Sequence, residues 1–424
     1  MKSAAKAELG CNKKGKMAIV HKLFSIEKNA VRINLKLFGI KIVIKRKFRP
    51  NKLIYKFPVQ NNKIFFKSFS NTYSCNPRYI LEEIQKEGLG VEFVWGVKDM
   101  QNSGSFPDNI KVVEYGSPEY IEEISSSKFI IRNDRSEDDL LLGLIKKPEQ
   151  IYIQTWHGSL GIKKTGVDIE IAKNKAIKVH EIDASTIDYL TSNSNFTDML
   201  FKNIFFNKGK ILKIGHPRND IFFRDNSDIK NKVYQKYNIN DSVKIVMYAP
   251  TFRDKSSDLS VYSIDLESVK TAFERKFGGK WIVLTRLHPK LIALKEKYAQ
   301  GLSESVIDVT SYPDMQELLC AVDAIITDYS SCIYDFMLTH KPGFIFATDI
   351  QKYNNLRGFY YPLESTPFPI AVNNEELIQN IETFDNQRYR QKVDEFLKEK
   401  GCIEDGHASE KVVSLIKDIM SGGK

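Results

Sequence analysis

The feature that most constrains the fold of this 424-residue chain is a repeated alternation of short apolar segments with helical stretches. Apolar segments of four or five residues, separated by helical stretches of about 10–15, are typical of parallel βαβ units. Two series of strands are expected, the first at residues 63–67, 91–95, 111–114, 128–132 and 150–154, the second at 243–248, 281–284, 306–309, 323–327 and 343–346. We therefore predict an α/β protein built from two doubly wound, Rossmann-like domains.

The length of the chain favours two domains with flanking segments. Helices are expected at 77–86, at about 375–399 and at 408–421, and the polar stretch 221–242 suggests the junction between the domains. The predicted divisions are a leader at 1–60, a first domain at 61–238, a second domain at 239–395 and a C-terminal helix at 396–424.

The leader is strongly basic, whereas the rest of the chain is nearly neutral. Residues 1–60 hold 16 of the 63 Lys and Arg residues but only Glu8 and Glu27 among the acidic ones. Apolar residues alternate over 31–37 and 40–44, which predicts a two-stranded hairpin with one apolar face. The hairpin is either an edge of the first domain or a patch that contacts an anionic membrane surface.

Composition excludes several other classes of protein. The five cysteines are scattered and have no metal-ligand spacing, so we expect reduced thiols and no metal site. No apolar run approaches the ~20 residues of a membrane span, and no secretory signal is apparent. The neutral body argues against a nucleic-acid partner. A cytoplasmic protein is expected.

Polar motifs directly follow four of the predicted strands. They begin at Thr155, Tyr248, Thr285 and Asp328. Because ligands of open parallel sheets bind beyond the carboxyl ends of the strands, these motifs should converge on one crevice.

The residues in these motifs suit a phosphate ligand. Arg218, Arg253 and Arg286, with Lys163 and Lys164, are cations that can bind phosphate oxygens. The stretch from Asp328 to Ser331 precedes an apolar helix, where free N–H groups favour an anion. Neither a Gly-x-Gly-x-x-Gly fingerprint nor a P-loop occurs. The expected ligand is a diphosphate held by side chains and a helix end.

Two histidines stand in functional settings. His157 adjoins Gly158, where the backbone allows a close approach, and His288 lies between Arg286 and Pro289. A lone histidine is more often structural than catalytic, but these contexts favour function.

The motifs together resemble the CDP-glycerol glycerophosphotransferase family, which builds teichoic acids and capsule polymers. The matching stretches lie between residues 63 and 361, and include Trp156–Gly158, Gly215–Asp220, Tyr248–Arg253, Arg286–Pro289 and Thr327–Asp335. Family members commonly read His-Gly-Thr-Pro-Leu-Lys-Lys after the first strand series, whereas the loop from His157 to Lys164 is one residue longer. The contacts of the loop lysines and the choice of acceptor are therefore open.

The resemblance implies a glycosyltransferase-B architecture, with two domains that face a central cleft and a donor bound mainly by the second. It implies that His157 and His288 are the catalytic pair. It also implies that the donor is held by Arg218, Pro250, Thr251, Arg286, Ser330, Ser331 and Asp335. Gly158, Arg253, Leu287 and Asp328 lie in the same motifs and complete the candidate site.

The expected activity is transfer of glycerol phosphate, or another polyol phosphate, from a CDP-activated donor to a hydroxyl, with release of CMP. The donor is CDP-glycerol or CDP-ribitol, the acceptor a lipid-linked or polymeric glycan, and no cofactor is expected. The enzyme would work at the inner face of the bacterial membrane. Two alternatives stay open: a nucleotide-sugar glycosyltransferase of the same fold, and a non-catalytic assembly partner.

Overall fold

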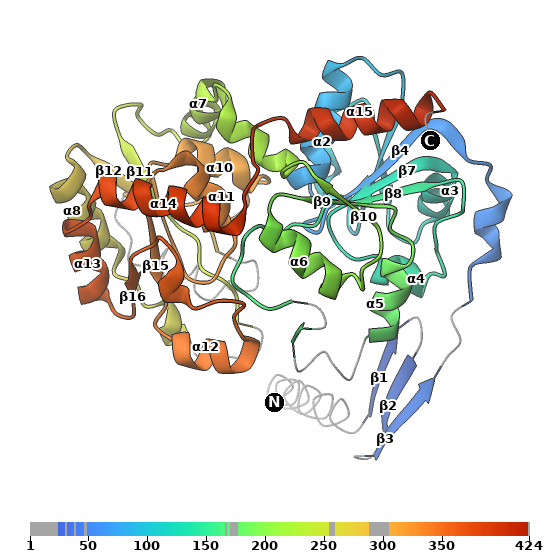
Figure 1. Cartoon of the computed structure of the whole chain (residues 1–424), viewed down its shortest axis with the longest axis horizontal. Helices are drawn as coiled ribbons and strands as arrows, with labels where there is room; N and C mark the ends of the chain where they lie inside the picture. Colours follow the sequence, from blue (N-terminus) through green and yellow to red (C-terminus); the bar gives the residue numbers. More distant parts are fainter. Residues whose placement is uncertain are drawn as a thin grey trace, which may run out of the picture.

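The computed structural model describes residues 49–165, 168–169, 177–253, 259–287 and 305–422, and the backbone of 24–29, 32–37 and 40–45. Within these residues it contains two parallel sheets and one small antiparallel sheet. Figure 1 shows the first domain on the right and the second on the left, with the small sheet below the first. The predicted α/β class with two parallel sheets is confirmed.

The first domain has a seven-stranded parallel sheet in the order β10-β9-β8-β7-β4-β5-β6. Its strands are β4 (Gln60–Lys67), β5 (Glu92–Val97), β6 (Ile110–Glu114), β7 (Ser127–Arg132), β8 (Ile151–Gln154), β9 (Tyr189–Ser192) and β10 (Lys210–Lys213). The central strand β4 is buried along its second half, as expected for a sheet covered on both faces. The order reverses between β4 and β7, which is the switch point of a doubly wound sheet.

The second domain has a six-stranded parallel sheet in the order β13-β12-β11-β14-β15-β16. Its strands are β11 (Lys244–Tyr248), β12 (Trp281–Thr285), β13 (Val306–Asp308), β14 (Ala324–Thr327), β15 (Gly343–Phe346) and β16 (Ile370–Ala371). In chain order this is 3-2-1-4-5-6, the arrangement of dinucleotide-binding folds, with its switch point between β11 and β14.

Helices cover both sheets (Figure 1). Before β11 they are α2 (Cys75–Lys86), α3 (Pro118–Ser126), α4 (Glu137–Leu141), α5 (Ile177–Ala184), α6 (Asn195–Ile204) and α7 (Ser227–Lys236). After β11 they are α8 (Leu266–Phe277), α10 (Met315–Ala321), α11 (Cys332–Phe336), α12 (Ile350–Arg357), α13 (Asn374–Glu382), α14 (Asn386–Lys400) and α15 (Ala408–Met420). Short 3-10 helices include η1 (Lys52–Lys56) and η4 (Pro217–Phe223).

All ten strands predicted for the two parallel sheets are present, and three further strands of these sheets, β9, β10 and β16, were not predicted. β9 and β10 have four residues each, and neither carries the apolar run that marks a central strand. The helix expected over 375–399 is wrong, because it is two helices, α13 and α14. Asp385 caps α14 by accepting a hydrogen bond from the Arg388 N–H, and Phe384 is buried between the two helices.

The domain divisions differ from those predicted. Ile54 in η1 packs into the core of the first domain, so the leader ends before residue 60. Val233 and Tyr234 of α7 pack into the core of the second domain, which therefore begins before residue 239. α14 ends at Lys400, so the predicted boundary at 395/396 falls inside it. α15 then crosses back and packs Val412, Val413 and Ile416 against the first domain.

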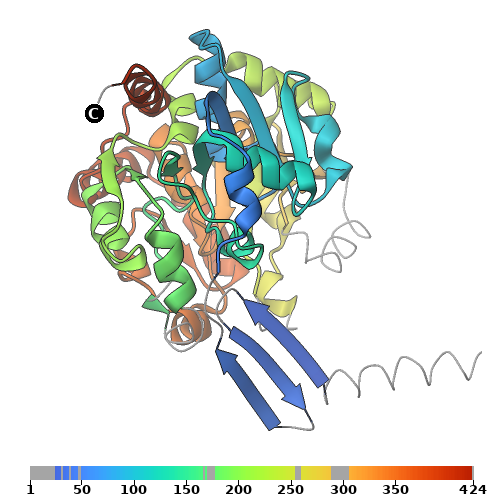
Figure 2. The same ribbon diagram turned by 90° about the vertical axis from the view of Figure 1, so that its right-hand side faces the viewer.

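The predicted hairpin is present and is extended by a third strand. β2 (Arg32–Leu37) pairs antiparallel with β3 (Ile40–Lys45), and β1 (Phe24–Asn29) pairs with the other side of β2. Figure 2 shows this sheet projecting from the body of the molecule. Among the residues with described structure, no helix is long and apolar enough to cross a membrane.

Candidate functional site

The candidate site is built from loops at the carboxyl ends of strands on either side of the two switch points. In the first domain these loops follow β4, β7 and β8. In the second domain they follow β11, β12 and β14. Within each sheet, the strand order places residues that are far apart in the chain at neighbouring strand ends.

His157 lies in the loop after β8, and its ring is held by a backbone carbonyl. The Nδ1 atom of His157 lies 2.5 Å from the carbonyl oxygen of Asn133, the residue after β7. A carbonyl oxygen only accepts hydrogen bonds, so Nδ1 carries the proton. In the neutral ring the lone pair is then on Nε2, which can accept a proton from a substrate.

Aromatic rings flank this imidazole. Phe69, from the loop after β4, stacks on His157 with ring centroids 4.6 Å apart, and the Trp156 ring lies at the same distance. Burial, with the nearby Arg218 charge, holds the pKa of His157 below its ordinary value of 6.5. The imidazole is therefore neutral at pH 7, the state that a general base requires.

The backbone before His157 is strained and is fixed by hydrogen bonds. Trp156 has a φ of 53°, in the left-handed region that non-glycine residues rarely adopt. The side-chain amide of Asn76 donates to the carbonyl oxygens of Thr155 and Trp156, at 3.2 and 2.9 Å. Gly158 follows, where an added Cβ would lie 3.0 Å from the Trp156 indole nitrogen. Such strain persists where the surrounding structure holds it, and it often marks a functional site.

In the second domain, Asp328 organises the loop after β11. Its carboxylate accepts the Thr251 N–H at 2.9 Å and pairs with the Arg253 guanidinium at 2.8 Å. Arg253 also makes a two-pronged contact with Asp349, at 2.9 Å for each hydrogen bond. Pro250 and Arg253 are buried. Arg253 and Asp328, both expected to hold the ligand, are thus bound to each other.

Arg218 and Asp335 also form a buried pair, and this pair joins the domains. Arg218 lies in η4 and Asp335 in α11, and the guanidinium lies 2.9 Å from the carboxylate. A second Arg218 nitrogen donates to the carbonyl oxygen of His157 at 2.8 Å. The Nε atom of Arg218 is buried without a partner among the described residues. Ser330 and Ser331 come directly before α11 and are half-buried.

Arg286 differs from Arg253 and Arg218 because its hydrogen-bond partners among the described residues are neutral carbonyl oxygens. It donates to the carbonyl oxygen of Tyr312 at 2.7 Å and lies 3.5 Å from that of Val309. Burial lowers the pKa of Arg286. The neighbouring Leu287 is buried, and its N–H donates to the Thr310 hydroxyl. His288 lies outside the described residues.

The loop after β8 reaches into the second domain. Leu160 and Ile162 belong to the hydrophobic core of that domain. Gly161 lies against the loop that follows β14, where an added Cβ would be 3.1 Å from the Ser331 Cβ. One loop therefore carries His157 and also contacts the predicted anion site.

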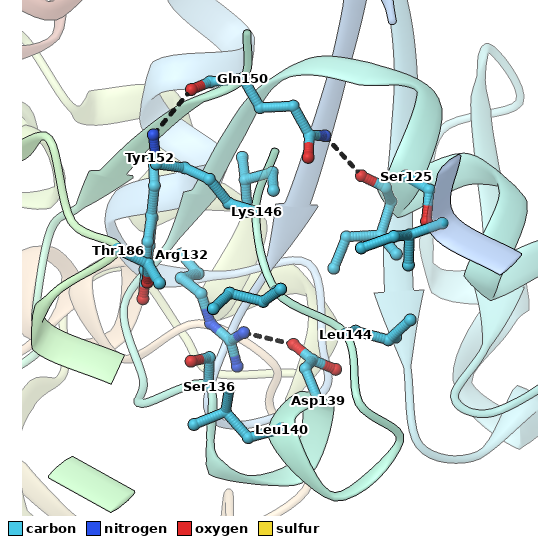
Figure 3. Close-up of a pocket in the computed structure, with 14 residues that line it drawn as sticks. Ser125, Arg132, Ser136, Asp139, Leu140, Leu144, Lys146, Gln150, Tyr152 and Thr186 are labelled. Atoms are coloured by element: carbon cyan, nitrogen blue, oxygen red, sulfur yellow. Dashed lines mark hydrogen bonds and ion pairs between the residues drawn. The ribbon is translucent and has the colours of Figure 1, made fainter. Parts of the chain in front are cut away.

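A small pocket of about 30 Å³ lies elsewhere in the first domain (Figure 3). It is lined by aliphatic side chains and by the ion pair between Arg132 and Asp139. This volume holds one or two water molecules and is far too small for a nucleotide. In the described part of the chain, no group of three or more His, Cys, Asp or Glu residues is placed to hold a metal.

The sequence prediction missed Asn133 and Phe69, which hold His157 in place. The Phe69 N–H donates to the side-chain oxygen of Asn133 at 2.9 Å, and the Asn133 carbonyl accepts from the imidazole. Both residues follow strands that flank the switch point, which is the signal that could have found them. The prediction also missed Asp349, the second partner of Arg253.

The fold and the site define a two-domain α/β protein with an imidazole and cationic side chains at its strand ends. A sequence profile of the CDP-glycerol:poly(glycerophosphate) glycerophosphotransferase family matches residues 50–418. The chain belongs to this family.

Named proteins with similar sequences act in teichoic acid synthesis. The chain is 31% identical to a teichoic acid poly(glycerol phosphate) polymerase of Staphylococcus epidermidis, over 89% of this chain and 54% of the polymerase. It is 30% identical to the teichoic acid glycerol-phosphate transferase of Staphylococcus aureus, over 86% of this chain and 95% of that protein. It therefore spans about half of the first relative and nearly all of the second.

A solved structure shows the same likeness. A variant of the wall teichoic acid polymerase TagF, soaked with CDPG, superposes with a TM-score of 0.76 and 31% sequence identity. The match covers 86% of this chain and 90% of that chain.

Proposed function

We propose that this protein transfers glycerol phosphate from CDP-glycerol to a hydroxyl of a membrane-associated glycan or poly(polyol phosphate) acceptor, releasing CMP. The observation that carries the proposal is the His157 ring, whose Nδ1 is committed to the Asn133 carbonyl and whose Nε2 is left as a base. Membership of the glycerophosphotransferase family supports the choice of donor. The setting is teichoic acid or capsule synthesis.

In this mechanism His157 Nε2 takes the proton of the acceptor hydroxyl. The oxygen of that hydroxyl attacks the β-phosphorus of the donor. A P–O bond forms, and the bond from the β-phosphorus to the bridging oxygen breaks. CMP leaves with the electron pair, and its charge is stabilised by Arg286, His288 and the loop of Ser330 and Ser331. Donors of this kind are worth about 10²–10³-fold in rate each.

We further propose that the two domains face each other across a cleft of the glycosyltransferase-B type, with the donor on the second domain. Pro250, Thr251 and Leu287 would line the donor site, and Gly158 would allow the acceptor to approach. The Arg253–Asp328 and Arg218–Asp335 pairs support these loops by holding them in place. Because we expect cationic side chains to neutralise the diphosphate, a divalent metal ion should not be required. We therefore expect activity to survive treatment with EDTA.

A donor screen tests the proposal. Purified protein is offered CDP-glycerol, CDP-ribitol and UDP-sugars with a polymeric acceptor, and release of CMP or UDP is followed. We expect CMP from a CDP-polyol and no UDP. Release of UDP alone would favour a nucleotide-sugar glycosyltransferase instead, and release of neither nucleotide would favour a non-catalytic partner.

A further inference from the structure

Two of the three arginines expected to bind phosphate are already neutralised. Arg253 is paired with Asp328 and Asp349, and Arg218 with Asp335. A donor diphosphate carries two negative charges at neutral pH, and paired cations attract it weakly because their own carboxylates repel it. Arg286 is left as one cation without a described carboxylate partner, and a second such cation near Ser330 and Ser331 would balance the other negative charge.

Lys163 is such a cation, and it comes from the first domain. It forms an antiparallel bridge with Phe359, in the segment that follows α12 of the second domain. Two hydrogen bonds fix this bridge: the Lys164 N–H donates to the Gly358 carbonyl at 3.0 Å, and the Tyr360 N–H donates to the Ile162 carbonyl at 2.8 Å.

The surroundings of Lys163 favour a bound anion. The carboxylate that most raises the pKa of Lys163 is Asp328, which is already paired with Arg253 and accepts the Thr251 N–H. Among the described residues no carboxylate forms an ion pair with Lys163. Burial lowers the pKa of Lys163 to about 8. A half-buried ammonium group without a paired carboxylate costs free energy, which an anionic ligand would offset.

We propose that Lys163 binds a phosphate oxygen of the donor diphosphate, so that a cation from the first domain closes over a donor bound by the second. The inference rests on the proposed function. Lys163 lies six positions after His157 in the same loop, and Gly161 between them touches Ser331. Donor binding would therefore also position the loop that carries the base.

An exposed lysine elsewhere in the first domain provides a matched control. Lys208 lies just before β10, at the amino end of a parallel strand, whereas the candidate site lies at the carboxyl ends of the strands. Lys208 carries the same charge as Lys163.

Calorimetric titration of the full chain with CDP tests the assignment. Lys163→Ala should weaken CDP binding about 10- to 100-fold, the usual loss for a charge-assisted hydrogen bond. Lys208→Ala should bind CDP within about twofold of the unaltered protein. Lys163→Arg keeps the charge and should retain most of the affinity. Equal CDP affinity in Lys163→Ala and Lys208→Ala would overturn the inference.

The pH dependence of CDP binding is a second readout. Between pH 7 and 9 Lys163 loses its proton, so CDP affinity should fall about tenfold in the unaltered protein and stay flat in Lys163→Arg. Besides burial, the charges of Asp328 and Cys332 raise the pKa of Lys163 and those of Arg357 and Arg253 lower it, and burial raises the pKa of the Cys332 thiol to about 11. A tenfold fall that persists in Lys163→Arg would assign the titration to another group and contradict the proposal.

Steady-state kinetics with the acceptor show whether Lys163 binds the phosphate of the donor or the phosphate of the acceptor. If Lys163→Ala raises the KM for a poly(glycerol phosphate) acceptor and leaves CDP binding unchanged, Lys163 binds acceptor phosphate and the donor assignment is wrong. If the unaltered protein binds no CDP, the proposed function fails together with this inference. If the unaltered protein binds CDP and Lys163→Ala binds it equally well, this inference fails and the proposed function stands.

Discussion

At the scale of single residues, the orientation of the His157 ring depends on a backbone carbonyl oxygen, which every residue type has. The Asn133 carbonyl sets the tautomer of the ring, and Phe69 and Trp156 set its plane. A base held in this way has already lost its rotational freedom before the substrate binds, so little more is lost in the reaction, which is how positioned groups lower a barrier.

Replacing His157 with Ala should lower kcat by about 10²–10⁴-fold, the range for general-base assistance, and leave CDP binding nearly unchanged. The control is His340→Asn, which alters an exposed histidine paired with Asp394. In the unaltered enzyme, kcat/KM should rise with pH and level off below pH 6.5, because the pKa of His157 is lowered and its neutral form is active. CMP release by the folded variant at a normal rate would remove His157 from the mechanism.

Arg286→Ala should weaken donor binding as well as rate, because the guanidinium has only neutral described partners and its charge is available to the diphosphate. The rate loss should be about 10²–10³-fold. Arg275→Ala, which removes an exposed arginine of α8 paired with Glu382, is the matched control. Calorimetry with CDP checks the binding; unchanged affinity in Arg286→Ala would refute its role as a phosphate ligand.

At the scale of elements, the loop after β8 is shared between the domains. Its first residues are held by the first sheet, whereas Leu160 and Ile162 pack in the core of the second domain. A change in the contact between this loop and Ser331 should therefore alter catalysis more than stability.

Gly161→Val tests this contact. Its Cβ would lie 3.1 Å from the Ser331 Cβ, so the loops must separate by a few tenths of an ångström, and more for the two added methyl groups. We expect kcat/KM to fall at least about tenfold because the geometry of the reacting groups changes. Gly90→Val is the control, since nothing lies within 4 Å of the position of its Cβ. Equal activity in the two variants would mean that the loop contact is incidental.

The segment between α14 and α15 contains a half-buried carboxyl group. Glu404 accepts hydrogen bonds from the His216 N–H and from the side chains of Asn193 and Asn219, at 2.9–3.0 Å. Burial raises the pKa of Glu404 to about 7. Because this pKa lies above the unfolded value, protonated Glu404 favours folding, and its contribution is lost as the pH rises towards 7.

Glu404→Gln should therefore be less sensitive to pH than the unaltered protein. We expect the Tm of the unaltered protein minus that of the variant to decrease between pH 5 and about pH 8, by an amount equivalent to roughly 3 kcal/mol or less. Thermal unfolding followed by circular dichroism over this range measures the difference. A difference that is constant with pH would show that Glu404 keeps the same charge in the folded and unfolded states.

At the scale of the whole molecule, the antiparallel sheet β1–β3 projects from the first domain (Figure 2). We propose that this basic segment binds the anionic inner face of the bacterial membrane, where a lipid-linked acceptor would be found. Each basic residue near such a surface contributes about 1 kcal/mol, and salt screens the attraction. Binding of this kind should be reversible and sensitive to salt.

Removal of residues 1–48 should release the protein from anionic vesicles and preserve activity on a small soluble acceptor. The cut is placed before η1 because Ile54 packs in the core of the first domain. Co-sedimentation of both forms at about 50 and about 500 mM salt is the measurement. Equal, salt-insensitive binding by the two forms would contradict membrane attachment, and insoluble truncated protein would make the sheet a structural edge of the domain.

The sequence by itself determined the α/β class, the ten principal strands and the place of the motifs at their ends. These features are local, because a buried strand needs a short apolar run and a motif needs only its neighbours along the chain. The same local pattern could not show the break between α13 and α14, where one cap and one buried ring interrupt a helical period. It also missed β9 and β10, which carry no apolar run.

Only the tertiary structure decided which cations are free. Arg253 and Asp349 are 96 positions apart, and Arg218 and Asp335 are 117 positions apart, yet each pair is in contact. A motif shows that an arginine is present but not whether a distant carboxylate neutralises it, because that depends on how the strands are ordered and how the domains meet. The tautomer of His157 was decided in the same way, by a carbonyl that folding brings to its ring.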